Sequence, residues 1–349
     1  MKVLVITNML PTPSSRSQGT FVRSQIESLR SRVEIDVLHI ERVERGRRIY
    51  ARAAARVRKA IQEGRPDVIH VMYGGALALL SAAAAGNTPL IVSICGSDLL
   101  GDPQPVWRQR AAGRLTVWAS IVAALRADAV IAKSKQLADR MPRVISRRKI
   151  HVVPNGVDFD HFRPLDTAEC RRILGWSEDE FHVLFTGAPG NGIKRFRDAQ
   201  DAVECVRARG VPARLQLMRN IPYEQVPIWI NAAHVMMLCS IHEGSPNIVK
   251  ESLACECPVI STDVADVAER IEGIEGCHLS SGNKTDLANC LEAVFQRGRR
   301  LECRNKISSI ALDMIADRIV AIYRSVLPGA PGARKQHRAN DCTEPFTRT

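Results

Sequence analysis

The chain has 349 residues, of which 45% are hydrophobic and 25% are charged, a composition typical of a globular protein long enough for two domains. No apolar run approaches the length of a membrane-spanning helix, so no such helix is predicted. The net charge is +12, but only 5% of residues are aromatic and no aromatic residue interleaves the clustered arginines, which argues against a nucleic-acid-binding protein.

The N-terminal residues MKVLVITNML predict a β-strand rather than a signal peptide, because a single lysine precedes a short apolar run that leads into a Pro/Ser-rich loop. The ten cysteines are scattered, mostly in apolar contexts, and have no zinc-like spacing. We therefore expect reduced, buried thiols and a cytoplasmic protein.

The first part of the chain alternates between short apolar runs and helical segments. Gly19 precedes a segment with helical spacing, Phe21–Ser31, and its place after the first strand would let a ligand approach the backbone. This alternation favours a doubly wound α/β domain. The predicted strands are residues 2–6, 35–40, 67–71, 90–94 and 129–131.

Polar residues follow two of these strands, at the edge where ligands bind in doubly wound sheets. His70 ends one strand, and Ser97 and Asp98 follow another. These three residues are candidates for contacts with an acceptor substrate. For Asp98 an equal alternative is a purely structural cap on the turn at Leu99.

Residues 42–59 contain eight basic residues and one acidic residue. On a helical wheel one face is basic and the opposite face is apolar, as in helices that lie on anionic membranes or bind anionic acceptors. A solvated helix of an α/β domain is the competing interpretation. The basic face consists of Arg45, Arg48, Arg52, Arg56 and Lys59.

The second part of the chain repeats the alternation after a turn at Asn155-Gly156. Asp158 and Asp160 form an Asp-x-Asp pattern, but it lies in this turn segment and metal binding is not expected there. A helix is predicted over residues 306–326, and residues 328–349 are polar, rich in Pro and Gly, and expected to be disordered. The predicted strands are residues 182–185, 214–218, 235–239 and 259–261.

Two loops of the second part have the features of phosphate sites. A glycine-rich loop beginning at Gly187 leads to Lys194 and Arg195 at the start of a helix. The other loop, Gly244 to Asn247, precedes a predicted helix from Ile248 to Cys257, with Ser245 as the expected N-cap and Pro246 at the first helical position. Backbone N–H groups at such a helix start suit a phosphate.

Two carboxylates flank this second loop. Glu243 precedes the helix, and Glu251 lies inside it, about 7 Å further along the axis. A ligand that touches both is long, anionic in the middle and rich in hydroxyls at its ends, which describes a nucleotide sugar. Two solvated surface glutamates are an equally weighted alternative on spacing alone.

The segment EGSPNIVKESLACECPVIST closely resembles the E-x7-E segment of retaining GT-B glycosyltransferases of group 1 and family 4, which include enzymes of bacterial cell-surface glycan and glycolipid assembly. The resemblance implies two Rossmann-like domains facing a cleft, with residues 1–160 for the acceptor and 161–305 for the donor. It also implies that the helix at 306–327 crosses back to the first domain, before a tail at 328–349.

The resemblance further implies the roles of individual residues. Glu243 would contact hydroxyls of the donor sugar, Glu251 would bind the ribose, and Lys194 would bind the diphosphate. The remaining donor contacts would come from the loop at Gly19, from Gly187, from Ile221 under the nucleobase, and from Gly244, Ser245, Pro246, Asn247 and Ile248.

The implied activity is transfer of a hexosyl group from a nucleotide-diphosphate sugar to a glycan or lipid-linked acceptor, without metal or cofactor and with possible attachment to the inner membrane face. The sequence departs from the family pattern at Cys95, where a histidine is usual, and at Ala188, where an arginine is usual. Arg195 is the candidate substitute for that arginine. A nucleotide-sugar hydrolase or epimerase, or a catalytically weak binding partner, are the alternatives.

Overall fold

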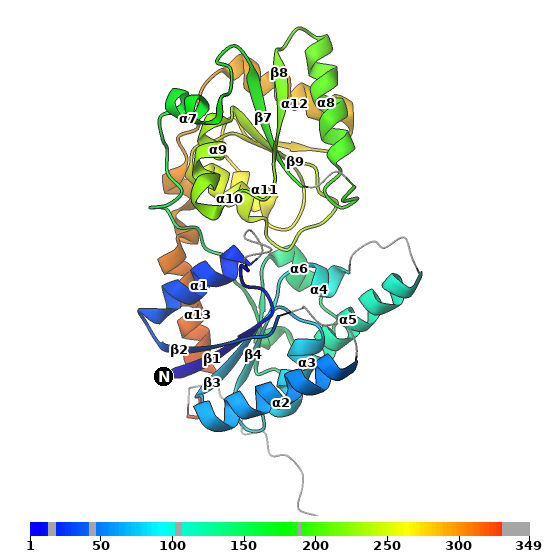
Figure 1. The fold of residues 1–349 in the computed structure, drawn as a ribbon, viewed down its shortest axis with the longest axis vertical. Coiled ribbons are helices and arrows are strands. Elements are labelled where there is room, and N and C mark those ends of the chain that lie inside the picture. Colours follow the sequence, from blue (N-terminus) through cyan, green and yellow to red (C-terminus); the bar gives the residue numbers. More distant parts are fainter. Residues whose placement is uncertain (13–18, 42–46, 102–106, 188–189, 330–349) are drawn as a thin grey trace, which may run out of the picture.

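The structure is a computed structural model that describes residues 1–12, 19–41, 47–101, 107–187 and 190–329, with the side chains of residues 47–51 and 107–109 left out. The fold has two α/β domains, each built on a β-sheet of parallel strands, and one domain lies above the other in Figure 1. Ala188 and the predicted disordered tail beyond Gly329 lie outside the described residues. Among the described residues, no helix is long and apolar enough to cross a membrane.

The first sheet has six parallel strands in the order β2-β1-β3-β4-β5-β6. Its central strands are buried on both faces, which is why they read as continuous apolar runs. The strands are β1 (Lys2–Thr7), β2 (Glu34–His39), β3 (Val68–Met72), β4 (Leu90–Ile94), β5 (Ala129–Ala132) and β6 (Ile150–Val152).

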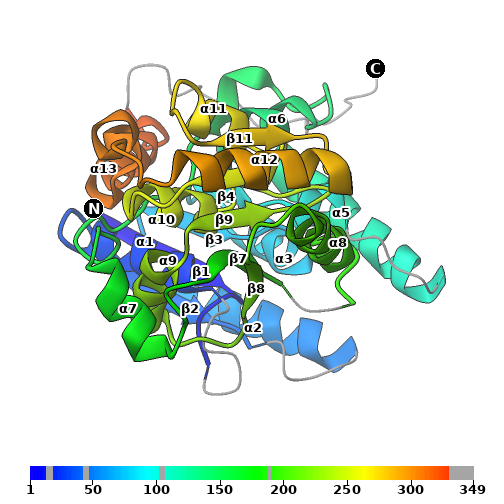
Figure 2. The same cartoon turned by 90° about the horizontal axis from the view of Figure 1, so that it is seen from above.

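Helices cover both faces of this sheet. Helices α2, α3 and α5 pack in that order on one face, while α1 packs with the last helix of the chain on the other (Figures 1 and 2). The helices are α1 (Thr20–Arg30), α2 (Arg47–Gly64), α3 (Ala76–Ala84), α4 (Ser97–Leu100), α5 (Trp107–Arg126) and α6 (Lys135–Asp139), followed by the 3-10 turn η1 (Arg147–Lys149).

The second sheet has five parallel strands in the order β11-β10-β9-β7-β8. Its strands are β7 (Phe181–Thr186), β8 (Ala213–Met218), β9 (Val235–Leu238), β10 (Val259–Thr262) and β11 (His278–Ser280). Its helical segments are α7 (Thr167–Leu174), α8 (Phe196–Ala208), η2 (Tyr223–Gln225), α9 (Val226–Ala232), α10 (Asn247–Ala254), α11 (Val267–Ile271), α12 (Lys284–Arg297) and η3 (Arg304–Ile310).

The chain crosses between the sheets twice, and the two crossings pair with each other. The backbone N–H of Val157 donates to Ile310, and the N–H of Leu312 donates to Val157, both at 2.9 Å. Gly156 is required here because a Cβ at this position would lie 2.8 Å from the Cα of Leu312. The crossings therefore act as one two-stranded connection between the domains.

The last helix, α13 (Leu312–Ser325), packs on the first domain as predicted. It buries Ile315, Ile319 and Tyr323 in the same core cluster as residues of β1 and α1. The predicted helix over 306–326 is interrupted, however, because residues 304–310 form η3, and Ala311 is extended between the two elements. The crossing itself needs this extended residue to pair with Val157.

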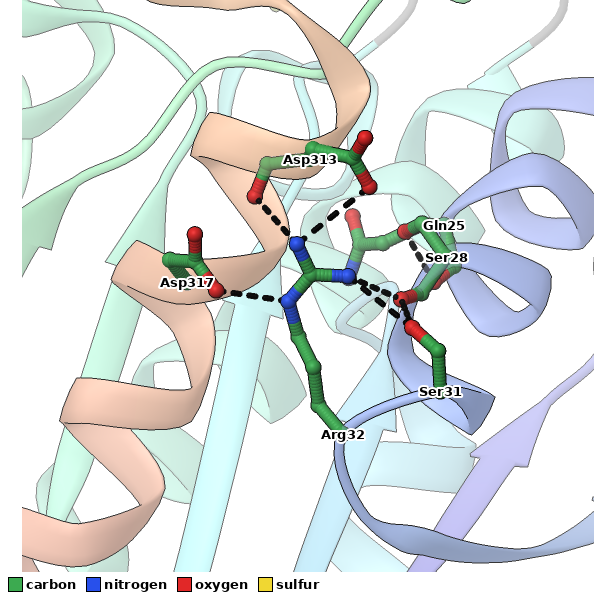
Figure 3. A network of polar contacts seen from close by, with 6 residues as sticks. All are labelled: Gln25, Ser28, Ser31, Arg32, Asp313 and Asp317. Carbon is green, nitrogen blue, oxygen red and sulfur yellow. Dashed lines mark hydrogen bonds and ion pairs between the residues drawn. The ribbon is translucent and has the colours of Figure 1, made fainter.

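Arg32 fastens α13 to the end of α1 (Figure 3). Its Nε donates to Asp317 at 2.6 Å, one terminal nitrogen donates to Asp313, and the other donates to the backbone of Ser28 at 2.9 Å. One guanidinium thus joins two helices separated by almost the whole chain. The hydrogen bond from Arg32 holds the pKa of the Asp317 carboxyl below its usual value.

Two edge strands, β6 and β11, have no counterpart among the predicted strands. Both are only three residues long and partly exposed, so they lack a buried apolar run. At the start of α6, the Ser134 side chain caps the helix by accepting a hydrogen bond from the backbone N–H of Leu137.

We expect Asp317→Asn to lower the Tm at neutral pH, because it removes the charged partner of Arg32. Since the pKa of Asp317 is depressed in the folded state, its contribution is present above the unfolded pKa and is lost as pH falls through the folded pKa. The Tm difference from wild type should therefore shrink in acid. Thermal unfolding at several pH values tests this, with Asp201→Asn on α8 as the control; equal Tm values at neutral pH would contradict it.

Candidate active site

A cavity of about 510 Å³ lies between the two domains and is lined by residues of both. Ten of the predicted donor-site residues line it, brought together from the loops that follow the strands. They are Gly19, Lys194, Ile221, Glu243, Gly244, Ser245, Pro246, Asn247, Ile248 and Glu251. The separated sequence motifs therefore face one common space.

Gly19 carries the first-domain loop into this cavity. It is the N-cap of α1 with a positive φ of 72°, and a Cβ at this position would lie 2.3 Å from the carbonyl oxygen of Met9. Only glycine fits both the conformation and the space. The backbone at the start of α1 is consequently open to a ligand.

Lys194 and Glu243 form an ion pair across the cavity wall, with Nζ and Oε1 2.6 Å apart. Both side chains are partly exposed to the cavity, and Glu243 also accepts a hydrogen bond from Ser240 at 2.7 Å. Gly187 does not line the cavity. A Cβ at Gly187 would lie 3.0 Å from the Cβ of Lys194, so this glycine makes room for the lysine stem.

The start of α10 has no side-chain cap, which corrects the prediction for Ser245 and Pro246. The helix begins at Asn247, Pro246 is the N-cap residue, and no side chain accepts from the first backbone N–H groups. Ser245 instead donates to Asp266 at 3.1 Å and accepts from Lys250 at 2.8 Å. The amides at this helix start therefore have no internal side-chain acceptor, as an anion site requires.

Lys250 connects this loop to the interdomain linker from a fully buried position. Its Nζ donates to the carbonyl of Asn155 at 3.1 Å as well as to Ser245. The side-chain amide of Asn155 donates to Asn247 at 3.1 Å. Burial lowers the pKa of Lys250 to about 8, so the ammonium form predominates at neutral pH. The start of α10, the loop before it and the linker are thus held as one unit.

Glu251 lines the same cavity and, like Glu243, is partly buried. Burial raises its pKa to about 7, and the nearby Lys250 charge only partly offsets this. Tyr223 lies on the same side of the cavity, beneath Arg23 of α1 at 5.9 Å, and burial raises the pKa of its hydroxyl to about 12. A carboxylate here accepts hydrogen bonds from ligand hydroxyls with little competition from water.

The two domains touch where Gly96 meets Gly244. A Cβ on Gly244 would lie 1.5 Å from the carbonyl oxygen of Cys95, and a Cβ on Gly96 would lie 3.0 Å from the Gly244 nitrogen. No side chain larger than hydrogen fits at Gly244 in this arrangement. The loop of Cys95, where the family pattern has histidine, therefore forms the cavity wall opposite α10.

The structure does not support two of the three predicted acceptor-side residues. His70 is fully buried, with its ring nitrogens 2.7 Å from the Tyr323 hydroxyl and 2.8 Å from Ser93, and burial lowers its pKa to about 3. Asp98 is also fully buried and accepts from the backbone N–H groups of Gly74, Cys95 and Gly96. It shapes the loop, whereas Ser97 lines the cavity.

Arg195 also turns away from the cavity, contrary to its predicted role. Its guanidinium donates to the carbonyl of Gly282 at 3.0 Å and pairs with Asp198. Arg195 is the N-cap of α8 and has a positive φ of 53°, so its side chain does not continue the direction of Lys194. Lys194, and not Arg195, is the cation that reaches Glu243.

Several cavity residues were not among the predicted site residues. They come from loops and from the ends of strands and helices, with no distinctive chemistry in sequence, although the turn at Asn155 marks one of them. Besides Cys95 and Gly96, these residues are Met9, Thr20, Phe21, Tyr73, Asn155, Thr186, Asn191, Ile193, Met218, Tyr223, Val226 and His242. Nine cysteines are described and all are free thiols. Within the described ranges no group of three or more His, Cys, Asp or Glu residues converges as a metal site.

We expect Glu251→Gln to raise the stability of the ligand-free protein at pH 8, on the order of 1 kcal/mol. The folded pKa near 7 exceeds the unfolded value, so the native state binds more protons between these values and wild-type stability falls as pH rises through that range. The variant has no ionisable carboxyl group at this position, so its stability does not fall in this way as pH rises. Unfolding curves at pH 8 and in mild acid test it, with Glu302→Gln as the control. A variant less stable than wild type at pH 8 would refute the raised pKa of Glu251.

Two family models match consecutive parts of the chain: "Glycosyltransferase Family 4" over residues 2–161 and "Glycosyl transferases group 1" over residues 167–297. A putative teichuronic acid biosynthesis glycosyltransferase of Bacillus subtilis is 28% identical over 58% of this chain, and the match spans 54% of that relative. D-inositol 3-phosphate glycosyltransferase 1 of Catenulispora acidiphila is 21% identical over 76% of this chain and 74% of its own length.

Solved structures share the whole fold. Sucrose-phosphate synthase of Thermosynechococcus elongatus superposes with a TM-score of 0.71 and 15% identity over 93% of this chain and 99% of that one. The structure of Anabaena HepE with UDP and glucose superposes with a TM-score of 0.65 and 16% identity, over 93% of this chain and 98% of that one. The UDP-GlcNAc 2-epimerase of Methanocaldococcus jannaschii superposes with a TM-score of 0.60 and 14% identity, over 92% of this chain and 99% of that one. With the GT-B fold and both family models in place, the chain belongs to the group 1 glycosyltransferases.

Proposed function

We propose that the chain moves a hexosyl group from a nucleotide-diphosphate sugar to a glycan or lipid-linked acceptor, with retention at the sugar carbon and without a metal ion. The observation that carries this proposal is the convergence of Lys194, Glu243, Glu251 and the uncapped start of α10 on one cavity. Together they present a cation and amides for a diphosphate, between two carboxylates that accept from hydroxyls.

The proposed donor pose follows from the polarity of the cavity walls. Ile221, Met218 and Val226 give an apolar wall that suits a nucleobase, with Glu251 beside it for the ribose. The diphosphate lies between Lys194 and the start of α10, and Glu243 accepts from hydroxyls of the sugar. In the structure Glu243 pairs with Lys194. A diphosphate bound to Lys194 therefore either shares the lysine with Glu243 or displaces the Glu243 carboxylate from it.

The proposed reaction depends on stabilising the leaving group. As the bond between the sugar carbon and the phosphate oxygen breaks, negative charge grows on the diphosphate, and Lys194 and the α10 amides are already oriented to receive it. The acceptor oxygen forms the new bond from the leaving-group side, and its proton passes to the departing phosphate oxygen. Contact at Gly96 and Gly244 closes the cavity around these atoms.

The names of two relatives refer to anionic compounds. One refers to teichuronic acid biosynthesis, which fits the proposed glycan acceptor, and the other to D-inositol 3-phosphate, which is a small polyol and neither a glycan nor a lipid-linked group. The basic face of α2 would suit such an acceptor or an anionic membrane on the cytoplasmic side. Arg52, Arg56 and Lys59 are exposed, although Arg56 donates to the carbonyl of His39 and Lys59 pairs with Glu63. Arg45 lies outside the described residues, as does the side chain of Arg48.

A thermal-shift screen with UDP-, GDP- and ADP-sugars tests donor binding without an acceptor. We expect a rise in Tm with one of the three donor classes. Glu243→Ala should then lower kcat about 100-fold or more while retaining a wild-type melting profile, with Glu302→Ala as the control. Near-normal sugar transfer by Glu243→Ala would reject its role.

The same experiments separate the alternatives. Consumption of the donor without a glycosylated product would favour a hydrolase or epimerase. If no nucleotide sugar raises the Tm, the result would favour a binding partner without catalytic activity.

We expect Gly244→Ala to lower turnover by about 100-fold, because the new Cβ would overlap the Cys95 carbonyl and hold the domains apart. Gly113→Ala on α5 is the matched control, since a Cβ there meets no atom within 4 Å. The rate of nucleoside diphosphate release and thermal melting are measured for both variants. A fully active Gly244→Ala protein would show that this contact is not needed for the reaction.

A further inference from the structure

Helix α5 exposes a stripe of large apolar side chains. Leu115, Trp118 and Leu125 are 63%, 55% and 38% exposed, and the partly exposed Val122 fills the gap between them. Their spacing of three, four and three residues places all four on one side of the helix. We call Leu115, Trp118, Val122 and Leu125 the α5 stripe.

The side of α5 opposite the stripe is the one that packs on the domain. Ala119, Ala123 and Ala127 at the helix end are buried there, and Ser120 is hydrogen-bonded inside. The stripe is therefore an additional apolar face, not the core-facing side of the helix. Every other exposed large apolar side chain of the described residues occurs on its own element, so only α5 gathers several.

The charges around the stripe have one sign. The α5 sequence contains four arginines and no acidic residue, and the exposed Arg114 and Arg126 border the stripe on either side of the helix. Helix α2, which packs against the shared neighbour α3, has six basic residues and one acidic residue. Apolar side chains between cations match a surface that has hydrocarbon beneath anionic headgroups.

The same helix is connected to the cavity. The Ser120 hydroxyl accepts from the backbone N–H of Gly75 at 2.7 Å and donates to the carbonyl of Asp98 at 2.7 Å. Asp98 in turn holds the N–H groups of Cys95 and Gly96, which line the cavity. The inner side of α5 thus supports the first-domain wall of the cavity, and the stripe lies on the outer side of the same helix.

We propose that the α5 stripe docks on an anionic lipid bilayer, with Trp118 and Leu115 entering the headgroup region and Arg114 and Arg126 contacting lipid phosphates. This inference adds a second membrane contact to the one proposed for the basic face of α2. Membrane binding by the stripe does not depend on the proposed function. Only the reason for the binding, access to a lipid-linked acceptor, rests on it. Docking by α5 would hold the first domain at the membrane in which such an acceptor resides.

Sedimentation with phosphatidylcholine vesicles, with and without phosphatidylglycerol, tests the proposal on the full chain without any nucleotide sugar. We expect binding to the anionic vesicles only. The double variant Leu115→Ser/Trp118→Ser should bind at least about tenfold more weakly. The matched control is Ile173→Ser/Met314→Ser, which removes two exposed apolar side chains from α7 and α13 and should bind like wild type.

A spectroscopic readout identifies the inserted residue. The intrinsic tryptophan emission of wild type should shift to shorter wavelength on anionic vesicles, and Trp118→Phe should abolish the shift while binding is retained. Arg114→Gln/Arg126→Gln should weaken binding and leave the fold unchanged. Equal vesicle binding by the stripe and control variants would overturn the proposal, as would a dimer of the chain that the stripe variant dissociates in light scattering. Because donor stabilisation is measured separately, neither result bears on sugar transfer.

Discussion

The backbone pairing of the two interdomain crossings is the constraint on which the rest of the arrangement depends. Val157 is hydrogen-bonded to the residues on either side of Ala311, and Gly156 has no side chain that would separate the strands. Beside them, Asn155 contacts Asn247 and Lys250 in the first turns of α10. The connection between the domains is therefore also the support of one wall of the cavity, and a change at the crossing alters the site.

The two glutamates of the cavity have different surroundings and hence different chemistry. Glu243 is partly exposed and paired with Lys194, so its charge is neutralised before a ligand arrives. Glu251 has no such cation at hydrogen-bonding distance among the contacts described, and burial raises its pKa to about 7. The raised pKa means that ionisation of Glu251 lowers the stability of the folded protein. In the proposed function, ligand hydroxyls that donate to this carboxylate offset the loss.

The first domain is asymmetric about its sheet. One face is closed by α1 and α13, which are joined by Arg32 and by a shared apolar core (Figures 1 and 3). The opposite face carries α2, α3 and α5, and its outer surface combines cations with the α5 stripe. The crossing helix thus stabilises one face, which leaves the other available for an interaction surface near the cavity.

Local patterns of the sequence by themselves determined the central strands, the glycine at the start of α1, the loops that carry Lys194 and Glu243, and the helix that carries Glu251. These features depend on interactions between near neighbours, such as apolar runs and glycine backbone conformations. Only the tertiary structure decided which polar residues reach the cavity. His70 and Asp98 satisfy their hydrogen bonds in the core, Arg195 points to Gly282, and Ser245 bonds to Lys250 and Asp266. Their directions depend on partners far away in the chain, and no local spacing specifies those partners.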